Sequence, residues 1–232
     1  MNPNTSSTTT TTTTTPTQDP RLPVWVSLPR NDLALAEAAI RGGASGIKVH
    51  LNAFHRASGT RFGSFSSERG FLLELAKLPA RKAIMIGQDE LPTALEMAEL
   101  KEMGFEGFNL YLKFAQPYLF ASGIRPILAL EKGFSEQDIA QIRAVPGAWI
   151  EASMVDPAHY GEALSEDDLA TYARIVESSG LPVLVPTQKK IRPEDLSRLK
   201  ATGVSGILIG VIVAGSTPES IEAATRAFVR HA

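Results

Sequence analysis

The chain has 232 residues, 44% hydrophobic and 21% charged, and its 23 Lys and Arg residues nearly balance 25 Asp and Glu, for a formal net charge of −2. This balance lacks the basic surface of a nucleic-acid-binding protein, and the absence of cysteine excludes disulfide scaffolds, thiolate metal sites and cysteine nucleophiles. No apolar run reaches the ~18–20 residues of a membrane span, so we expect no nucleic-acid partner, no membrane partner and a cytoplasmic location.

The first 20 residues form a Thr/Ser/Pro tract with no apolar run. Such a composition buries too little surface to offset the entropy of ordering, so we expect residues 1–20 to be a disordered tail. The tract also lacks the basic start and the hydrophobic centre of a secretory signal. The folded part is therefore predicted to span residues 21–232.

From Pro23 onward, short apolar runs of β type alternate with amphipathic stretches of helical period. Several stretches begin at a capping residue, namely Asn31 or Asp32, Ser135, Ser165 and Thr217, and several end at glycine. The apolar runs, which we expect to be strands, are residues 23–28, 45–52, 82–87, 107–113, 125–131, 148–154, 182–187 and 205–213.

Two kinds of junction recur between helix and strand, RGGASGIKV being one example, and their alternation suggests one βαβα unit used four times. Eight strand–helix pairs in ~200–250 residues are typical of a single (β/α)8 TIM barrel, an α/β fold. The alternative is an open doubly wound sheet. That fold usually has a glycine-rich fingerprint after its first strand, and the sequence here is PRND.

Strand side chains alternate between two faces, and the polar residues of these runs share one face, opposite apolar residues that would pack on helices. Lys48 and His50, for example, alternate with Ile47, Val49 and Leu51. Barrel enzymes place catalysis at the carboxyl ends of the strands, whereas a buried network of paired charges is the structural alternative. We predict Lys48, His50, Lys113, Glu131 and Glu151 as catalytic residues, and Asn52, Asn109, Tyr111 and Ser153 as substrate-binding residues.

The loop at residues 53–70 shows no clear period and carries Arg56 and Arg61 among small polar residues. Long loops in compact barrels are usually lids or binding loops, and arginine suits phosphate or carboxylate. We therefore predict that both arginines bind substrate, with Gly59 and Gly63 as hinges; a solvated loop is the alternative.

The closing segment, residues 182–228, contains Pro193-Glu194-Asp195, Gly203-Val204, Ile209-Gly210 and Gly215-Ser216. It resembles the last quarter of the ribulose-phosphate-binding barrels, a superfamily that includes phosphosugar epimerases, indole-glycerol-phosphate synthase and thiamine-phosphate synthase. No single family is identified. The resemblance implies that backbone N–H groups here bind a substrate phosphate. Gln188-Lys189-Lys190 replaces the usual glycine of the seventh-strand loop and supplies a lysine. The phosphate-binding residues implied are Gln188, Lys189, Gly210, Gly215 and Ser216.

Three functions follow as hypotheses for a small phosphorylated substrate. The first is acid–base chemistry next to a carbonyl, of isomerase or epimerase type, with Glu151 or His50 as base and Lys48 or Lys113 stabilising an enolate. The second is a carbon–carbon lyase or aldolase that uses a Schiff-base lysine, or a divalent cation such as Mg²⁺ held by Glu131 and Glu151. The third is a phosphate-ligand-binding barrel without turnover. A homo-oligomer is compatible with all three.

Overall fold

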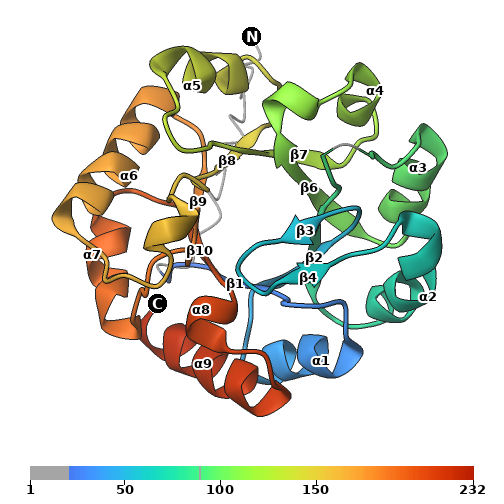
Figure 1. Cartoon of the computed structure of the whole chain (residues 1–232), viewed down its shortest axis with the longest axis horizontal. Helices are drawn as coiled ribbons and strands as arrows, with labels where there is room; N and C mark the ends of the chain where they lie inside the picture. The colour runs from blue at the N-terminus through green and yellow to red at the C-terminus, as the bar shows by residue number, and fades with distance from the viewer. Residues whose placement is uncertain (1–20, 89) are drawn as a thin grey trace, which may run out of the picture.

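The computed structural model describes residues 21–88 and 90–232, and there the predicted α/β barrel is confirmed. Eight parallel strands close in the order β1-β10-β9-β8-β7-β6-β5-β2, with helices around them (Figure 1). The prediction for residues 1–20 lies outside the described residues. The barrel strands are β1 (Val24–Ser27), β2 (Gly46–His50), β5 (Arg81–Met85), β6 (Phe105–Tyr111), β7 (Arg125–Ala129), β8 (Trp149–Glu151), β9 (Val183–Pro186) and β10 (Gly206–Ile209).

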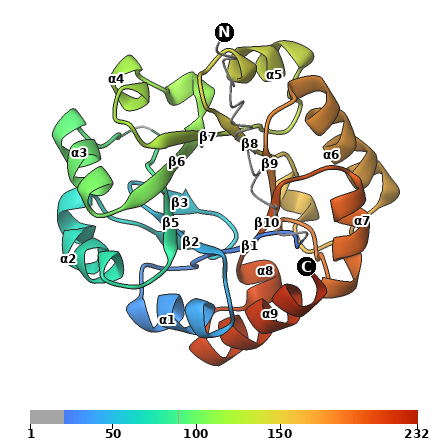
Figure 2. The same ribbon diagram turned by 180° about the vertical axis from the view of Figure 1, so that it is seen from behind.

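The outer ring of helices is seen around the barrel in both views (Figures 1 and 2). Among the described residues, no helix is both long enough and apolar enough to cross a bilayer. The α-helices are α1 (Leu33–Arg41), α2 (Phe65–Ala76), α3 (Ala94–Glu102), α4 (Pro117–Phe120), α5 (Glu136–Arg143), α6 (Glu166–Ser179), α7 (Leu196–Ala201), α8 (Val211–Ala214) and α9 (Pro218–His231). Short 3-10 turns lie at η1 (Leu112–Phe114), η2 (Pro157–His159) and η3 (Pro193–Asp195).

The predicted capping residues begin the helices where expected. Asp32 caps α1 through its side chain, and Ser135, Ser165 and Thr217 each form a capping box at the start of α5, α6 and α9. A capping side chain satisfies backbone N–H groups that the first turn leaves unpaired. The helix starts are therefore encoded locally.

Two hydrophobic clusters divide the core between the outside and the inside of the barrel. The larger cluster contains the outward faces of the strands, including Ile47 and Val49, packed against the helices. The smaller one fills the lumen and consists of Trp25, Ala83, Ile127, Leu184 and Leu208, with Trp149 against it. This apolar floor lies below the polar residues near the carboxyl ends of the strands, so the strands supply both a packed base and a polar mouth.

Gly46, at the start of β2, is required for packing inside the barrel. A Cβ atom on Gly46 would lie 2.4 Å from Cζ3 of the Trp25 ring, its neighbour in the strand register. Its φ is not in the left-handed region. The missing side chain makes room for the tryptophan in the lumen.

We predict that Gly46→Ala destabilises the protein by about 1–3 kcal/mol, because overpacking forces ring or backbone displacement. The same change in a Trp25→Leu background should cost clearly less, since leucine lacks the clashing ring atoms. Urea unfolding of the four proteins in a double-mutant cycle measures the difference. Equal costs in both backgrounds would contradict the packing argument.

Several predicted strands end earlier than expected, with residues 112 and 113 in η1 and residues 152–154 beyond β8, and two segments take a different form. Residues 211–213, predicted as the end of the last strand, form the short helix α8, because the register of β10 with β1 ends at Ile209 and no described strand lies beyond it to pair. The loop at residues 53–70 contains an antiparallel hairpin, β3 (Phe54–His55) with β4 (Thr60–Arg61), followed by the start of α2. Ser64 caps α2. This local helix start was not predicted, because the surrounding residues show no helical period.

Candidate active site

A cavity of about 480 Å³ opens at the carboxyl ends of the barrel strands, with the β3–β4 hairpin over it. Figure 1 shows the hairpin in front of the centre of the barrel. All eleven residues predicted as catalytic or substrate-binding line this cavity: Lys48, His50, Asn52, Arg56, Arg61, Asn109, Tyr111, Lys113, Glu131, Glu151 and Ser153. Their roles remain predictions.

The floor of the cavity holds a buried ion pair. Nζ of Lys48 donates to Oε2 of Glu151 at 2.6 Å, and each side chain is 7% exposed. Lys48 lies on β2 and Glu151 on β8, with β5, β6 and β7 between them on one side and β1, β10 and β9 on the other. The pair therefore spans the lumen between opposite strands.

The second predicted pair of charges lies at the rim. Nζ of Lys113 is 2.7 Å from Oε1 of Glu131, and these side chains are 54% and 51% exposed. Lys113 follows β6 in η1, and Glu131 follows the neighbouring strand β7. The four charges thus form two separate pairs rather than one buried network, and only the Lys48–Glu151 pair is desolvated. The Lys113–Glu131 pair also lines a side cavity of about 310 Å³ above α5.

His50 lies beneath the hairpin in a desolvated environment. Its ring stacks on Phe62, with centroids 4.6 Å apart, and lies 4.8 Å from the ring of His55. Its Nδ1 is buried without a hydrogen-bond partner among the described residues. Burial, and then the nearby charges of His55 and Lys48, hold the pKa of His50 well below its usual value. His50 is therefore neutral at pH 7, and its ring can accept a hydrogen bond.

His55, for which the sequence predicts no role, also lines the cavity. Its Nδ1 lies 2.7 Å from Oγ of Ser58. Burial, and then the Lys48 charge, lower the pKa of His55 to about 4. Both histidines near the hairpin are neutral at pH 7, so the positive charge of the cavity comes from lysine and arginine.

These lowered pKa values predict that the protein loses stability in mild acid. Between about pH 6.5 and pH 4 the unfolded chain binds protons at the two histidines that the folded chain does not, so the free energy of unfolding falls as the pH falls through this range. We expect His55→Gln to reduce this loss by roughly 1–3 kcal/mol. Urea unfolding at pH 7 and pH 4.5 measures the loss of stability between the two pH values. The control is His231→Gln, a change at an exposed histidine. An unchanged loss in His55→Gln would contradict the assignment.

Polar side chains between β6, β8 and β9 form a hydrogen-bonded wall of the cavity. Nε2 of Gln188 donates to Oγ of Ser153 at 3.0 Å and to the hydroxyl of Tyr160 at 2.9 Å, and its Oε1 accepts from the N–H of Val155 at 3.1 Å. Burial raises the pKa of Tyr111, which a hydrogen bond with Ser153 opposes. Tyr160 lies in an irregular loop, where no strand alternation existed to reveal it.

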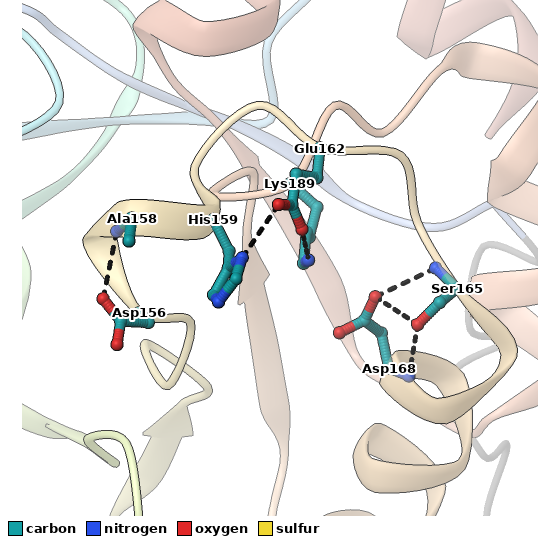
Figure 3. Close-up of polar contacts among 7 residues, drawn as sticks. All are labelled: Asp156, Ala158, His159, Glu162, Ser165, Asp168 and Lys189. Carbon is teal, nitrogen blue, oxygen red and sulfur yellow. Dashed lines mark hydrogen bonds and ion pairs between the residues drawn. The ribbon is translucent and has the colours of Figure 1, made fainter.

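The predicted phosphate-binding residues do not come together. Gln188 and Gly210 line the cavity, whereas Lys189, Gly215 and Ser216 are not among its lining residues. Nζ of Lys189 lies 2.9 Å from Oε2 of Glu162, whose Oε1 lies 2.8 Å from Nδ1 of His159, as Figure 3 shows. The Ser216 carbonyl accepts a hydrogen bond from Arg30. These contacts fasten loops to each other outside the cavity.

The two arginines of the hairpin region differ from the lysines in their partners. Arg61 lies over the ring of Phe54, 5.7 Å from its centroid. Burial raises the pKa of Tyr160, and the charge of Arg56 across the mouth opposes that rise. Within residues 21–88 and 90–232, neither arginine has a carboxylate partner. In the same part of the chain, no three His, Asp or Glu residues are grouped so that they could hold a metal ion.

Several solved structures have the same barrel. The chain is similar to KGPDC from Streptococcus mutans (15% identity, TM-score 0.67, covering 91% of this chain and 97% of that one). It is also similar to phosphoribosyl anthranilate isomerase from Thermus thermophilus (15%, 0.61, 90% and 98%) and to thiamine phosphate pyrophosphorylase from Pyrococcus furiosus (15%, 0.60, 90% and 95%). No family model and no curated protein matches. At these identities the matches establish the fold, in agreement with the predicted resemblance, and no single family.

Proposed function

We propose that the protein is an enzyme that moves a proton at the carbon next to a carbonyl group in a small phosphorylated metabolite, as isomerases and epimerases do. The observation that carries this proposal is the buried Lys48–Glu151 pair on the cavity floor. A carboxylate and an ammonium group that are desolvated together supply a base and a charge for the developing oxyanion.

The pair supplies the groups for the first proton transfer. The Glu151 carboxylate accepts the proton from the carbon, the bonding electrons move to the carbonyl oxygen, and the Lys48 ammonium stabilises the resulting enolate. Return of the proton by Glu151 to the neighbouring carbon gives the isomer. The epimer requires a second acid, such as water, to deliver a proton to the opposite face of the same carbon, after which Glu151 releases its proton to solvent. Neutral His50, which also lines the cavity, is the alternative base.

Lys113 and Glu131 suit a different role in this scheme. Their pair is about half exposed at the rim and lies between the main cavity and the side cavity. A water-exposed charge stabilises an oxyanion less than a desolvated one does. We therefore assign the reacting end of the substrate to Lys48 and Glu151, and substrate contacts to the rim pair.

A carbon–carbon lyase is the second candidate, favoured by the placement of the Lys48 amine on the cavity floor. After losing a proton, the amine would add to a substrate carbonyl and release water, and the iminium would accept the electrons of the breaking bond. The metal-assisted version has less support, because Glu131 and Glu151 each hold a lysine.

The test is to incubate the protein with a panel of phosphorylated aldoses and ketoses in D₂O and to follow deuterium incorporation by mass spectrometry. Incorporation next to the carbonyl of one compound is expected under the first proposal. Borohydride trapping of a covalent adduct on Lys48 would favour the lyase. Binding without exchange, cleavage or adduct would overturn both and leave a ligand-binding barrel.

A further inference from the structure

The cavity carries an excess of positive charge. Among the residues that the structure describes, four cationic side chains, Lys48, Arg56, Arg61 and Lys113, line it against the two carboxylates of Glu131 and Glu151. His50 and His55 add no charge at pH 7, since both pKa values are lowered. The lining is therefore electropositive by two charges, which suits a dianionic ligand such as a phosphate ester.

The excess charge resides on the hairpin region. Each of the two lysines is within 2.7 Å of its own carboxylate, whereas no described carboxylate pairs with Arg56 or Arg61. An arginine without a carboxylate presents its planar fork of N–H donors, the geometry that binds phosphate. Arg56 and Arg61 are the lining cations open to an anion.

On the opposite side of the mouth, where the resemblance places a phosphate, the predicted side chains and the Gly210 N–H are in use, and the backbone N–H groups of Val211 and Ile212 at the start of α8 line the cavity. The Gly210 N–H donates to Oγ1 of Thr187 at 2.8 Å. The side chain of Gln188 is bonded to Ser153, Tyr160 and Val155, and Lys189 pairs with Glu162 outside the cavity. An anion bound by Gln188, Lys189 or the Gly210 N–H would have to displace these contacts, and no cationic side chain lines the cavity on this side among the described residues.

The hairpin is held at its base and reaches across the mouth. Backbone bonds join Asn52 to Gly63 and Ala53 to Phe62, each at 2.8 Å, and the Phe62 ring stacks on His50. Asn52 has a φ of 47°, a left-handed conformation that turns the chain from β2 into the hairpin. This anchored base sets the position of Arg56. Burial raises the pKa of Tyr160 in the β8–α6 loop, and the charge of Arg56 opposes that rise.

We infer that the β3–β4 hairpin, through Arg56 and Arg61, is the phosphate-binding element of this site. The inference rests on the proposed function for its substrate class and departs from the β9–β10 location implied by the resemblance. A phosphate held by the hairpin leaves the carbonyl end of the substrate free to reach Lys48 and Glu151 on the floor. The ligand class is a small phosphate ester with a carbonyl group.

The experiment measures binding of ribose 5-phosphate, with ribose as the dephosphorylated control, by isothermal titration calorimetry. Arg56→Ala and Arg61→Ala should each weaken ribose 5-phosphate binding about 10- to 100-fold, the loss of a charge-assisted hydrogen bond. Arg56→Lys should recover part of the loss, because lysine keeps the charge without the fork. Arg69→Ala, an exposed arginine paired with Glu99 on the next helix, is the charge-matched control and should bind like the wild type.

A rival variant tests the other side of the mouth. Val211→Pro removes one backbone N–H at the first position of α8, where proline is best tolerated. Unchanged binding by Val211→Pro supports the hairpin site. Loss of binding in Val211→Pro, with both arginine variants unaffected, would overturn the inference and leave the proposed function intact. If the wild type distinguished no phosphate ester from its dephosphorylated form, the proposed substrate class itself would fail.

Discussion

Glu151→Gln is expected to lower deuterium exchange and turnover at least ~100-fold, the contribution of a general base. The substitution preserves the shape of the side chain and a hydrogen bond to Lys48 Nζ but removes the ability to accept a proton. Substrate affinity should change far less, because the inferred phosphate contacts lie on the hairpin. Turnover and binding are measured separately, the second by calorimetry.

The matched control for this prediction is Glu74→Gln. Glu74 accepts from Lys77 at 2.6 Å, the same separation as in the Lys48–Glu151 pair, but on the exposed surface of α2. The Glu74→Gln variant should retain the wild-type rate of deuterium exchange. Retained exchange in Glu151→Gln would remove Glu151 from the proton transfer and make neutral His50 the remaining candidate base.

Lys48→Met is expected to destabilise the fold by about 3–5 kcal/mol, because it leaves the Glu151 carboxylate buried without a partner. Replacing both partners, as Lys48→Met with Glu151→Leu, should recover most of that loss, since two apolar side chains remove the uncompensated charge. Urea unfolding at pH 7 gives the free energy of unfolding of each variant.

Lys77→Met provides the comparison for the buried pair and should cost about 0–1 kcal/mol, as exposed ion pairs do. Equal losses for Lys48→Met and Lys77→Met would show that the lumen pair is solvated and would weaken its proposed catalytic role. If the double variant were as unstable as Lys48→Met, packing rather than charge would explain the loss.

Local signals in the sequence were sufficient for most of the fold. The eight strands, the capping residues and the polar faces of β2 and β8 are matters of spacing along a few consecutive residues. Strand alternation correctly directs Lys48 and His50 toward the lumen and Ile47 and Val49 toward the helices. The hairpin and α8 escaped prediction because short apolar or irregular runs depend on whether a neighbouring strand is present to pair with them.

The sequence by itself determined the barrel and most of the polar residues that line its mouth, whereas only the tertiary structure decided which charges are partners. Lys48 and Glu151 are 103 positions apart and meet because barrel closure sets β2 opposite β8. Lys113 and Glu131 follow the neighbouring strands β6 and β7 and so meet in water at the rim. Pairing in turn decides which cations remain for a ligand, and for that reason Arg56 and Arg61, rather than Lys189, are the ones left facing the cavity.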